Sequence, residues 1–239
     1  MYSFMSRIRY SECDSEKTLS IPALINYFQD CSTQQSEDIG MGFAYTEPLK
    51  CVWVLAAWQV IIHRMPRLGE TVEVGTLPYD FKGFLGLRNF FMKSADGEML
   101  AVANSQWTLI STETMKPMKP TEKMLECYAP EPKLEMDYAG RKIVIPENIQ
   151  ALEPFQVLRI HLDSNNHVNN SQFISMASVY LPMDREIYQF RAEYKVQAHL
   201  GDTIVPVVAV AEDVACVSLQ NEQGMVYCNV EFTFRTKRF

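Results

Sequence analysis

The chain aligns with itself at a shift of 149 residues, and this internal repeat limits its possible folds more than any other feature. The shift places Cys-Asp-Ser at residues 13–15 on Leu-Asp-Ser at residues 162–164. It also places Ile25 on Ile174 in the apolar stretch that follows. Self-similarity of this kind predicts that one structural unit occurs twice in the chain.

The second copy is the shorter one. Leu-Gly-Glu-Thr at residues 68–71 is matched by Leu-Gly-Asp-Thr at residues 200–203, which is a shift of only 132. A proline-rich segment separates the copies, and proline cannot continue a strand ladder or a helix. We therefore expect an N-terminal domain at 1–115, a surface linker at 116–150 with a brief helix near 121–127, and a C-terminal domain at 151–239.

Each copy is predicted to consist of a helix and a sheet. Ser20 is a capping residue with apolar residues at helical spacing behind it, so a helix is expected from there to about Asp38. The second helix is expected from Asn169 to Leu181. Segments rich in β-branched and aromatic residues predict antiparallel strands at 52–63, 70–77, 84–93 and 99–110, and again at 188–197, 203–211, 215–220 and 225–235. The fold class is therefore α+β, with an antiparallel sheet wrapped around a long helix in each copy.

Composition excludes several classes of protein. The 239 residues carry a net charge of -7, which argues against nucleic acid as a partner because phosphates attract basic surfaces. The apolar stretch at 51–62 is too short to span a bilayer. Residues 1–10 lack the apolar core of a secretory signal, so a cytoplasmic location is expected. The six cysteines show no zinc-site spacing and are interpreted as reduced, mostly packed thiols.

The run Asp-Ser-Asn-Asn-His-Val-Asn-Asn at residues 163–170 crowds a carboxylate, carboxamides and an imidazole before the second helix. Such a cluster can activate a water molecule. At the shift of 149, Thr18 stands where His167 stands, so only the second copy is expected to be catalytic. The alternative interpretation is an ordinary cap and turn, because asparagine-rich loops often precede helices. The other histidines are interpreted as strand or turn residues rather than metal ligands, namely His63, His161 and His199.

These motifs together carry a family resemblance. Ile-Arg-Tyr at 8–10, Gly-Glu-Thr-Val-Glu-Val at 69–74, Ser-Gln-Trp at 105–107 and the D-x-N-x-H-V-N-N signature at 163–170 span nearly the whole chain. The chain resembles the acyl-acyl carrier protein (acyl-ACP) thioesterases of plants and bacteria, and it looks like a bacterial member. The resemblance implies a tandem (double) hotdog fold, with the acyl-chain pocket in the first domain and catalysis in the second.

The resemblance also implies a set of site residues. Asp163, Asn165 and His167 stand at the catalytic positions. Gln197 stands where plant members carry a catalytic glutamate, and a carboxamide can hold water but cannot act as a base. Ala198 stands where many plant members have a cysteine, so direct attack by water is favoured, with His167 or Asp163 as the base. No cofactor and no metal are implied.

The implied reaction is hydrolysis of fatty acyl-ACP thioesters to free fatty acid and ACP in fatty acid biosynthesis. The partner is therefore an acyl carrier protein with a phosphopantetheine-linked acyl chain, and a homodimer is possible. Two alternatives remain open at this point: an acyl-CoA thioesterase of the same fold, and a non-catalytic acyl-thioester binding module. A hotdog dehydratase fits the signature less well.

Two further groups of residues have functional and structural interpretations. Aromatic residues, together with the methionines, are candidates for the wall of an acyl tunnel or for plain core: Trp53, Trp58, Phe81, Phe84 and Trp107. Basic residues are candidates for contact with an acidic carrier, or they are scattered surface charge: Lys82, Arg88, Lys116, Lys119, Lys123, Arg141, Lys142, Arg235, Lys237 and Arg238.

Overall fold

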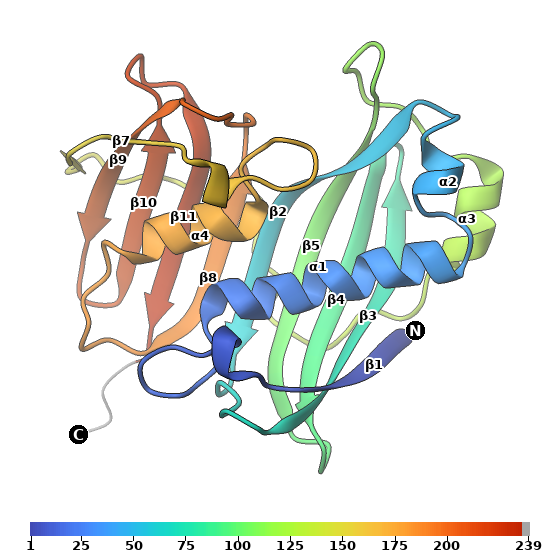
Figure 1. Cartoon of the computed structure of the whole chain (residues 1–239), viewed down its shortest axis with the longest axis horizontal. Helices are drawn as coiled ribbons and strands as arrows, with labels where there is room; N and C mark the ends of the chain where they lie inside the picture. The colour runs from blue at the N-terminus through green and yellow to red at the C-terminus, as the bar shows by residue number, and fades with distance from the viewer. Residues whose placement is uncertain (236–239) are drawn as a thin grey trace. The chain divides into compact units, whose positions relative to one another are not determined.

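The computed structural model describes residues 1–235, which form two compact units (Figure 1). Unit 1 consists of Met1–Ala56 and Ile62–Tyr138, and unit 2 consists of Ala57–Ile61 and the described residues from Ala139 onward. Strand β2 (Cys51–Ile62) therefore contributes residues to both units. Within the described residues, no helix is both long and apolar enough to cross a membrane.

Unit 1 is an antiparallel sheet with one long helix across a face. Its strands lie in the order β1-β3-β4-β5-β2, and helix α1 contacts β1 and β3 (Figure 1). In chain order the elements are β1 (Tyr2–Arg7), the 3-10 turn η1 (Tyr10–Glu12), α1 (Ile21–Asp38), α2 (Phe43–Thr46), β2, β3 (Thr71–Lys82), β4 (Leu85–Ser94), β5 (Met99–Ser111) and α3 (Glu122–Tyr128). The four predicted strands are confirmed, although β3 continues to Lys82, past its predicted end at Leu77. The predicted first helix and the brief helix predicted in the linker are also confirmed, whereas the edge strand β1 was not predicted.

Helix α1 begins where the capping residue predicts. The Ser20 hydroxyl oxygen accepts a hydrogen bond from the backbone N–H of Ala23 at 3.4 Å, which satisfies one of the free donors of the first turn. Its apolar face is fully buried at Leu24, Ile25 and Phe28. The Phe28 ring packs against Phe90 of β4 with the ring centroids 5.3 Å apart. Burial of this face therefore holds the helix on the sheet.

Unit 2 repeats the arrangement in a shorter form. Its strands lie in the order β2-β8-β11-β10-β9-β6, with β7 also paired to β9, and helix α4 contacts β10 and β11 (Figure 1). The elements are β6 (Gln150–Ala151), β7 (Phe155–Gln156), η2 (Arg159–His161), α4 (Asn170–Ser178), β8 (Ile187–Tyr194), β9 (Thr203–Val210), β10 (Val214–Gln220) and β11 (Val226–Phe234).

Two element ends in unit 2 differ from the prediction. Helix α4 stops at Ser178, three residues before the predicted end, and Pro182 follows, which disfavours a helical conformation at the residue before it. Strand β8 stops at Tyr194 instead of Gln197. The backbone N–H groups of residues 195 and 196 both turn to the carbonyl oxygen of Tyr227, so the chain leaves the ladder there.

The segment between the predicted domains is held down more firmly than a surface linker would be. Met124 and Tyr128 of α3 are buried in a cluster of unit 1. In unit 2, Arg191 donates to the carbonyl oxygens of residues 140 and 142, and Ile143 is buried. The backbone N–H of Ile143 donates to the buried carboxylate of Glu193. The prolines of this segment thus interrupt helices and strands, but the segment is still held in place by buried side chains and hydrogen bonds.

Candidate active site

The predicted catalytic motif of unit 2 is a tight turn organised by Asp163. One carboxylate oxygen of Asp163 accepts from the backbone N–H of Asn165 at 2.8 Å and of His167 at 3.2 Å. The backbone N–H of Asp163 donates to the carbonyl oxygen of His167 at 2.8 Å. Asn166, at the tip, has a φ of 60°. Asp163 therefore shapes the turn that presents His167, through main-chain hydrogen bonds.

Unit 1 contains the same turn, bond for bond. One carboxylate oxygen of Asp14 accepts from the backbone N–H of Glu16 at 3.0 Å and of Thr18 at 3.1 Å. The backbone N–H of Asp14 donates to the carbonyl oxygen of Thr18 at 2.9 Å, and Lys17 at the tip has a φ of 61°. The predicted alignment at a shift of 149 is thus confirmed in three dimensions. The difference is at Thr18, whose hydroxyl donates to Asp14, while an imidazole stands at that position in unit 2.

Helix α4 starts three residues after the turn's histidine, His167. Asn169 is the cap, as predicted, because its side-chain oxygen accepts from the backbone N–H of Ser171 at 2.9 Å and from its hydroxyl at 3.0 Å. The hydroxyl of Tyr194 on β8 donates to the carbonyl oxygen of Asn170 at 3.0 Å. Burial raises the pKa of Tyr194 well above its usual range, so this donor stays protonated. His167 is therefore attached to a fixed helix start.

The chain that leaves β8 runs directly beside the motif. The backbone N–H of Val168 donates to the carbonyl oxygen of Ala198 at 2.9 Å, which brings residues 197–199 next to the turn. Gln197 is exposed at the start of this stretch. The ring of His199 lies 4.9 Å from the ring of His167, edge to face at 76°. A second imidazole therefore belongs to the site.

Sequence reasoning missed this contact. His199 is the turn residue that was predicted, but the prediction gave it no partner. The hydrogen bond between residues 168 and 198 brings the two imidazoles together, and no spacing in the sequence encodes it. His161 keeps its predicted role as a turn residue: its Nδ1 accepts from the backbone N–H of Leu158 at 3.0 Å, and burial lowers its pKa.

The arrangement provides a half-exposed imidazole with neighbouring polar groups. His167 is partly buried, whereas Asn165 and Gln197 are exposed. An imidazole so placed can accept a proton from a water molecule, and carboxamides can position that water. Residues 1–235 contain no group of three or more histidine, cysteine, aspartate or glutamate side chains suited to a metal ion.

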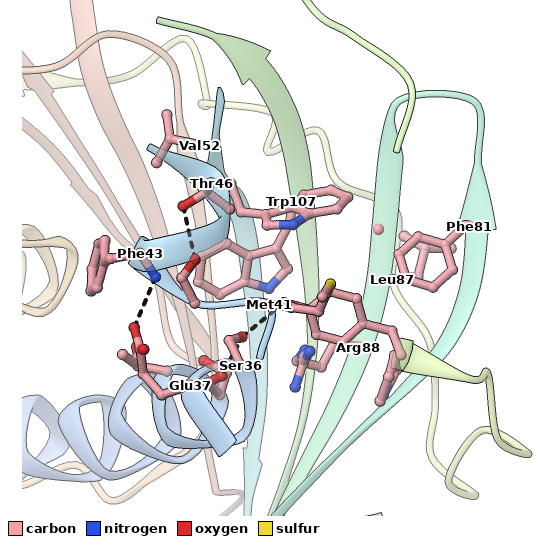
Figure 2. A pocket seen from close by; sticks show the side chains of 17 residues that line it. Ser36, Glu37, Met41, Phe43, Thr46, Val52, Phe81, Leu87, Arg88 and Trp107 are labelled. Atoms are coloured by element: carbon pink, nitrogen blue, oxygen red, sulfur yellow. Dashed lines mark hydrogen bonds between the residues drawn. The ribbon is translucent and has the colours of Figure 1, made fainter. Parts of the chain in front are cut away.

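Unit 1 contains a cavity of about 780 Å³, part of it open to solvent (Figure 2). Trp53, Phe81 and Trp107 line it, which agrees with the predicted aromatic wall, and Met41 adds a flexible apolar side chain. The two other predicted aromatics differ. Trp58 is buried and Phe84 is exposed, and neither lines the cavity. Its mostly apolar lining suits an apolar ligand.

Arg88 is a correction to the predicted carrier-binding surface. Its side chain is buried at the cavity, where it donates to Gln35 and, at 3.2 Å, to the hydroxyl of Thr76. Its guanidinium carbon lies 5.5 Å from the centroid of the Tyr128 ring. Burial lowers its pKa to about 10. A cation in this position cannot meet a protein partner at the surface. Of the other predicted basic residues, Lys237 and Arg238 lie outside the described residues.

Comparison with known proteins gives the family. Residues 1–128 match the acyl-ACP thioesterase N-terminal domain, and residues 146–236 match the acyl-ACP thioesterase C-terminal domain. An acyl-[acyl-carrier-protein] hydrolase of Cuphea viscosissima is 27% identical over 85% of this chain. An oleoyl-acyl carrier protein thioesterase of Arabidopsis thaliana is 25% identical over 82% of it. The chain spans only 52% and 60% of the lengths of these two relatives.

Solved structures share the fold along the whole chain. An acyl-ACP thioesterase from Bacteroides thetaiotaomicron has a TM-score of 0.90 at 21% identity, covering 98% of this chain and 97% of its own. A 12:0-ACP thioesterase from Umbellularia californica has a TM-score of 0.86 at 19% identity, covering 99% and 97%. The predicted α+β double hotdog fold is confirmed. On the evidence of both domain matches, the chain is a member of the acyl-ACP thioesterase family.

Proposed function

We propose that this protein hydrolyses fatty acyl-ACP thioesters by activated water and releases free fatty acid and ACP, in fatty acid biosynthesis. The observation that carries the proposal is the pair of matched turns in a member of this family. Both copies keep the same main-chain hydrogen bonds, but only the copy in unit 2 has an imidazole at the variable position. A purely structural turn needs no imidazole, since Thr18 completes the same frame in unit 1.

The proposed chemistry needs one base and one set of positioned polar groups. His167 accepts a proton from water as the water oxygen attacks the thioester carbonyl carbon. The carbon–sulfur bond then breaks, and the same proton passes to the departing thiolate of the phosphopantetheine arm. In this scheme Asn165 and Gln197 bind the water or the carbonyl oxygen through hydrogen bonds. Asp163 acts indirectly, because it shapes the turn that carries the imidazole.

The two units take different parts in the proposal. The apolar cavity of unit 1 accommodates the acyl chain, and the turn of unit 2 supplies the reacting groups. The carrier partner is an acyl carrier protein, whose acidic surface would meet exposed lysines such as Lys82. The expected cytoplasmic location and the possible homodimer stay predictions.

The decisive experiment compares wild type with His167→Ala and with the matched control Thr18→Ala. Acyl-ACP substrates with a range of chain lengths are hydrolysed, and the released fatty acid is measured. A positioned base is worth about 100-fold to 10,000-fold in rate, so we expect His167→Ala to lower kcat/KM by about that factor. Thr18→Ala removes a side-chain group from the equivalent turn of unit 1 and is expected to leave kcat/KM within about 3-fold of wild type.

Other outcomes would replace the proposal. Near wild-type turnover by His167→Ala would show that the reacting group lies elsewhere. The same acyl chain presented on coenzyme A tests the carrier: faster turnover on coenzyme A than on ACP would make the protein an acyl-CoA thioesterase. Tight binding of acyl-ACP without release of fatty acid would make it a binding module.

A further inference from the structure

The two units share a second hydrogen-bonded turn, related by the shift of 132. In unit 1 the backbone N–H of Arg67 donates to the carboxylate of Glu70 at 2.9 Å. In unit 2 the backbone N–H of His199 donates to the carboxylate of Asp202 at 2.8 Å. Residues 67 and 70 plus 132 give residues 199 and 202, so the turns are equivalent. His199 therefore stands where unit 1 has an arginine.

The carboxylates of these turns have different neighbours. In unit 1 the guanidinium of Arg64 donates to both oxygens of Glu70, at 3.0 and 2.8 Å, so that carboxylate is committed to an ion pair. The position equivalent to Arg64 in unit 2 is Val196, since 64 plus 132 is 196. Without an arginine there, Asp202 lies 3.8 Å from Nδ1 of its own turn's histidine, His199.

The surroundings of His199 form a short chain of contacts that ends at His167. Asp202 faces one side of the His199 ring, and the ring of His167 is in edge-to-face contact with it at 4.9 Å. The hydroxyl of Tyr227 is hydrogen-bonded to Asp202 as well. Burial raises the pKa of Tyr227, and the negative charge of Asp202 raises it further. Asp202 fixes the backbone of His199 through the hydrogen bond from its N–H, while its carboxylate lies near Nδ1 beyond hydrogen-bond distance.

We infer that His199 is a positioning residue for the proposed catalytic imidazole: placed beside the motif by the turn that Asp202 holds, it keeps the His167 ring in its working orientation. This inference rests on the proposed function. The helix cap and the Asp163 turn fix the backbone of His167, but they leave its ring free to rotate about the side-chain bonds. The edge-to-face contact with His199 restricts that rotation. Such aromatic pairs have a preferred geometry, which a smaller side chain cannot supply.

The kinetic test uses His199→Ala, His199→Phe and the matched control Arg67→Ala in unit 1. A misplacement of about 1 Å at a reacting group lowers the reaction rate by roughly 100-fold. Loss of one restraint on the ring is a milder change, so we expect kcat to fall about 10-fold in His199→Ala. We expect KM to stay within about 2-fold, because substrate binding does not use this contact. Phenylalanine keeps a flat ring against His167 and is expected to restore most of kcat. Arg67→Ala is expected to match wild type.

His199 and Asp202 are 58% and 36% exposed in their side chains, so the variants are expected to keep the wild-type thermal midpoint. A wild-type kcat in His199→Ala would overturn the inference while the proposed function stood. A kcat for His199→Phe as low as for His199→Ala would also overturn it, because the ring contact would then not be what matters.

A spectroscopic measurement tests the contact without any turnover. The chain has four histidines, so the imidazole C–H signals of His167 can be assigned in NMR spectra by substitution. The ring of His199 shifts those signals through its ring current, and we expect them to move in His199→Ala but to stay closer to their wild-type positions in His199→Phe. Unchanged His167 signals in His199→Ala would refute the positioning role, whether or not the protein hydrolyses acyl-ACP. A wild-type protein that hydrolyses no acyl-ACP would refute the proposed function instead.

Discussion

Arg64 links two carboxylates in unit 1. Its guanidinium donates to Glu70 and also to Glu98, with the shortest distance 2.7 Å. Because of the hydrogen bonds from Arg64, the pKa of Glu70 lies below its ordinary value. The Arg64 side chain is 39% exposed and that of Glu70 is 22% exposed, so solvent weakens the pair. The ion pair between Arg64 and Glu70 therefore makes a modest, pH-dependent contribution to the stability of the fold.

Glu70→Gln tests this pair. A carboxylate whose pKa is lowered by folding stabilises the protein above its unfolded pKa of about 4.3, and the stabilisation is lost as pH falls through the folded pKa. We expect the variant to be less stable than wild type by about 0.5 kcal/mol at pH 7. The difference should shrink as the pH falls below about 4. Urea unfolding at a series of pH values measures it, and a difference that is independent of pH would contradict the assignment.

At the scale of residues, the sequence located the turn of the candidate site but not its surroundings. The spacing of Asp163, Asn165 and His167 marks a turn before a helix, and local hydrogen bonds are enough to form it. His199 and Asp202 could not be identified in this way, because their place beside the turn depends on a hydrogen bond between distant segments. The catalytic roles of the predicted residues stay predictions.

The two helix starts offer a comparison at the scale of elements. Ser20 caps α1 and Asn169 caps α4, each through a side-chain oxygen that accepts a backbone N–H. Alanine at either position is expected to lower the unfolding free energy by about 1 kcal/mol. Only Asn169→Ala is expected to lower kcat as well, because the helix start of unit 2 carries His167.

Denaturant unfolding and acyl-ACP hydrolysis of both cap variants measure these effects. An equal loss of kcat in Ser20→Ala would show that the caps act on activity through general stability. Unchanged stability in Asn169→Ala would show that the other contacts of this helix start are sufficient to hold it.

Element starts were predicted more accurately than element ends. Caps are local, so Ser20 and Asn169 mark the helix starts directly. The end of β8 depends on Tyr227, a residue of another strand, whose carbonyl oxygen draws the chain out of the ladder. The strand β1 escaped prediction because Met5 is an apolar residue on its exposed face, which obscures the alternation of a half-buried strand.

At the scale of the whole molecule, the cavity of unit 1 is the feature that would set acyl-chain length. Val52→Trp places a large ring at the cavity wall, and Val179→Trp places the same ring at a site that is 75% exposed. Small changes in fit to an apolar pocket change rates by about 10-fold to 200-fold, so we expect Val52→Trp to slow the longest accepted chain by at least about 10-fold relative to a short one.

Competition assays with mixed acyl-ACP substrates measure this shift in preference. Val179→Trp is expected to keep the wild-type preference. If Val52→Trp kept it too, with its fold intact, the acyl chain would bind outside this cavity.

The overall architecture was predictable because it is built from a repeat. One helix and one set of strands, once recognised, predict the second set, and the alignment holds at the level of individual hydrogen bonds. The folded course of the connecting segment was not predictable in the same way. Its buried residues, such as Ile143, have no counterpart in a repeat and take their place only when both the strand and the segment have formed.

The twin turns around Asp14 and Asp163 have a consequence for engineering. Because the two loops share one backbone path, residues 163–167 can be grafted onto positions 14–18, or the reverse, without altering the course of the main chain. The difference between the two turns thus lies in the side chains that one common main-chain frame presents.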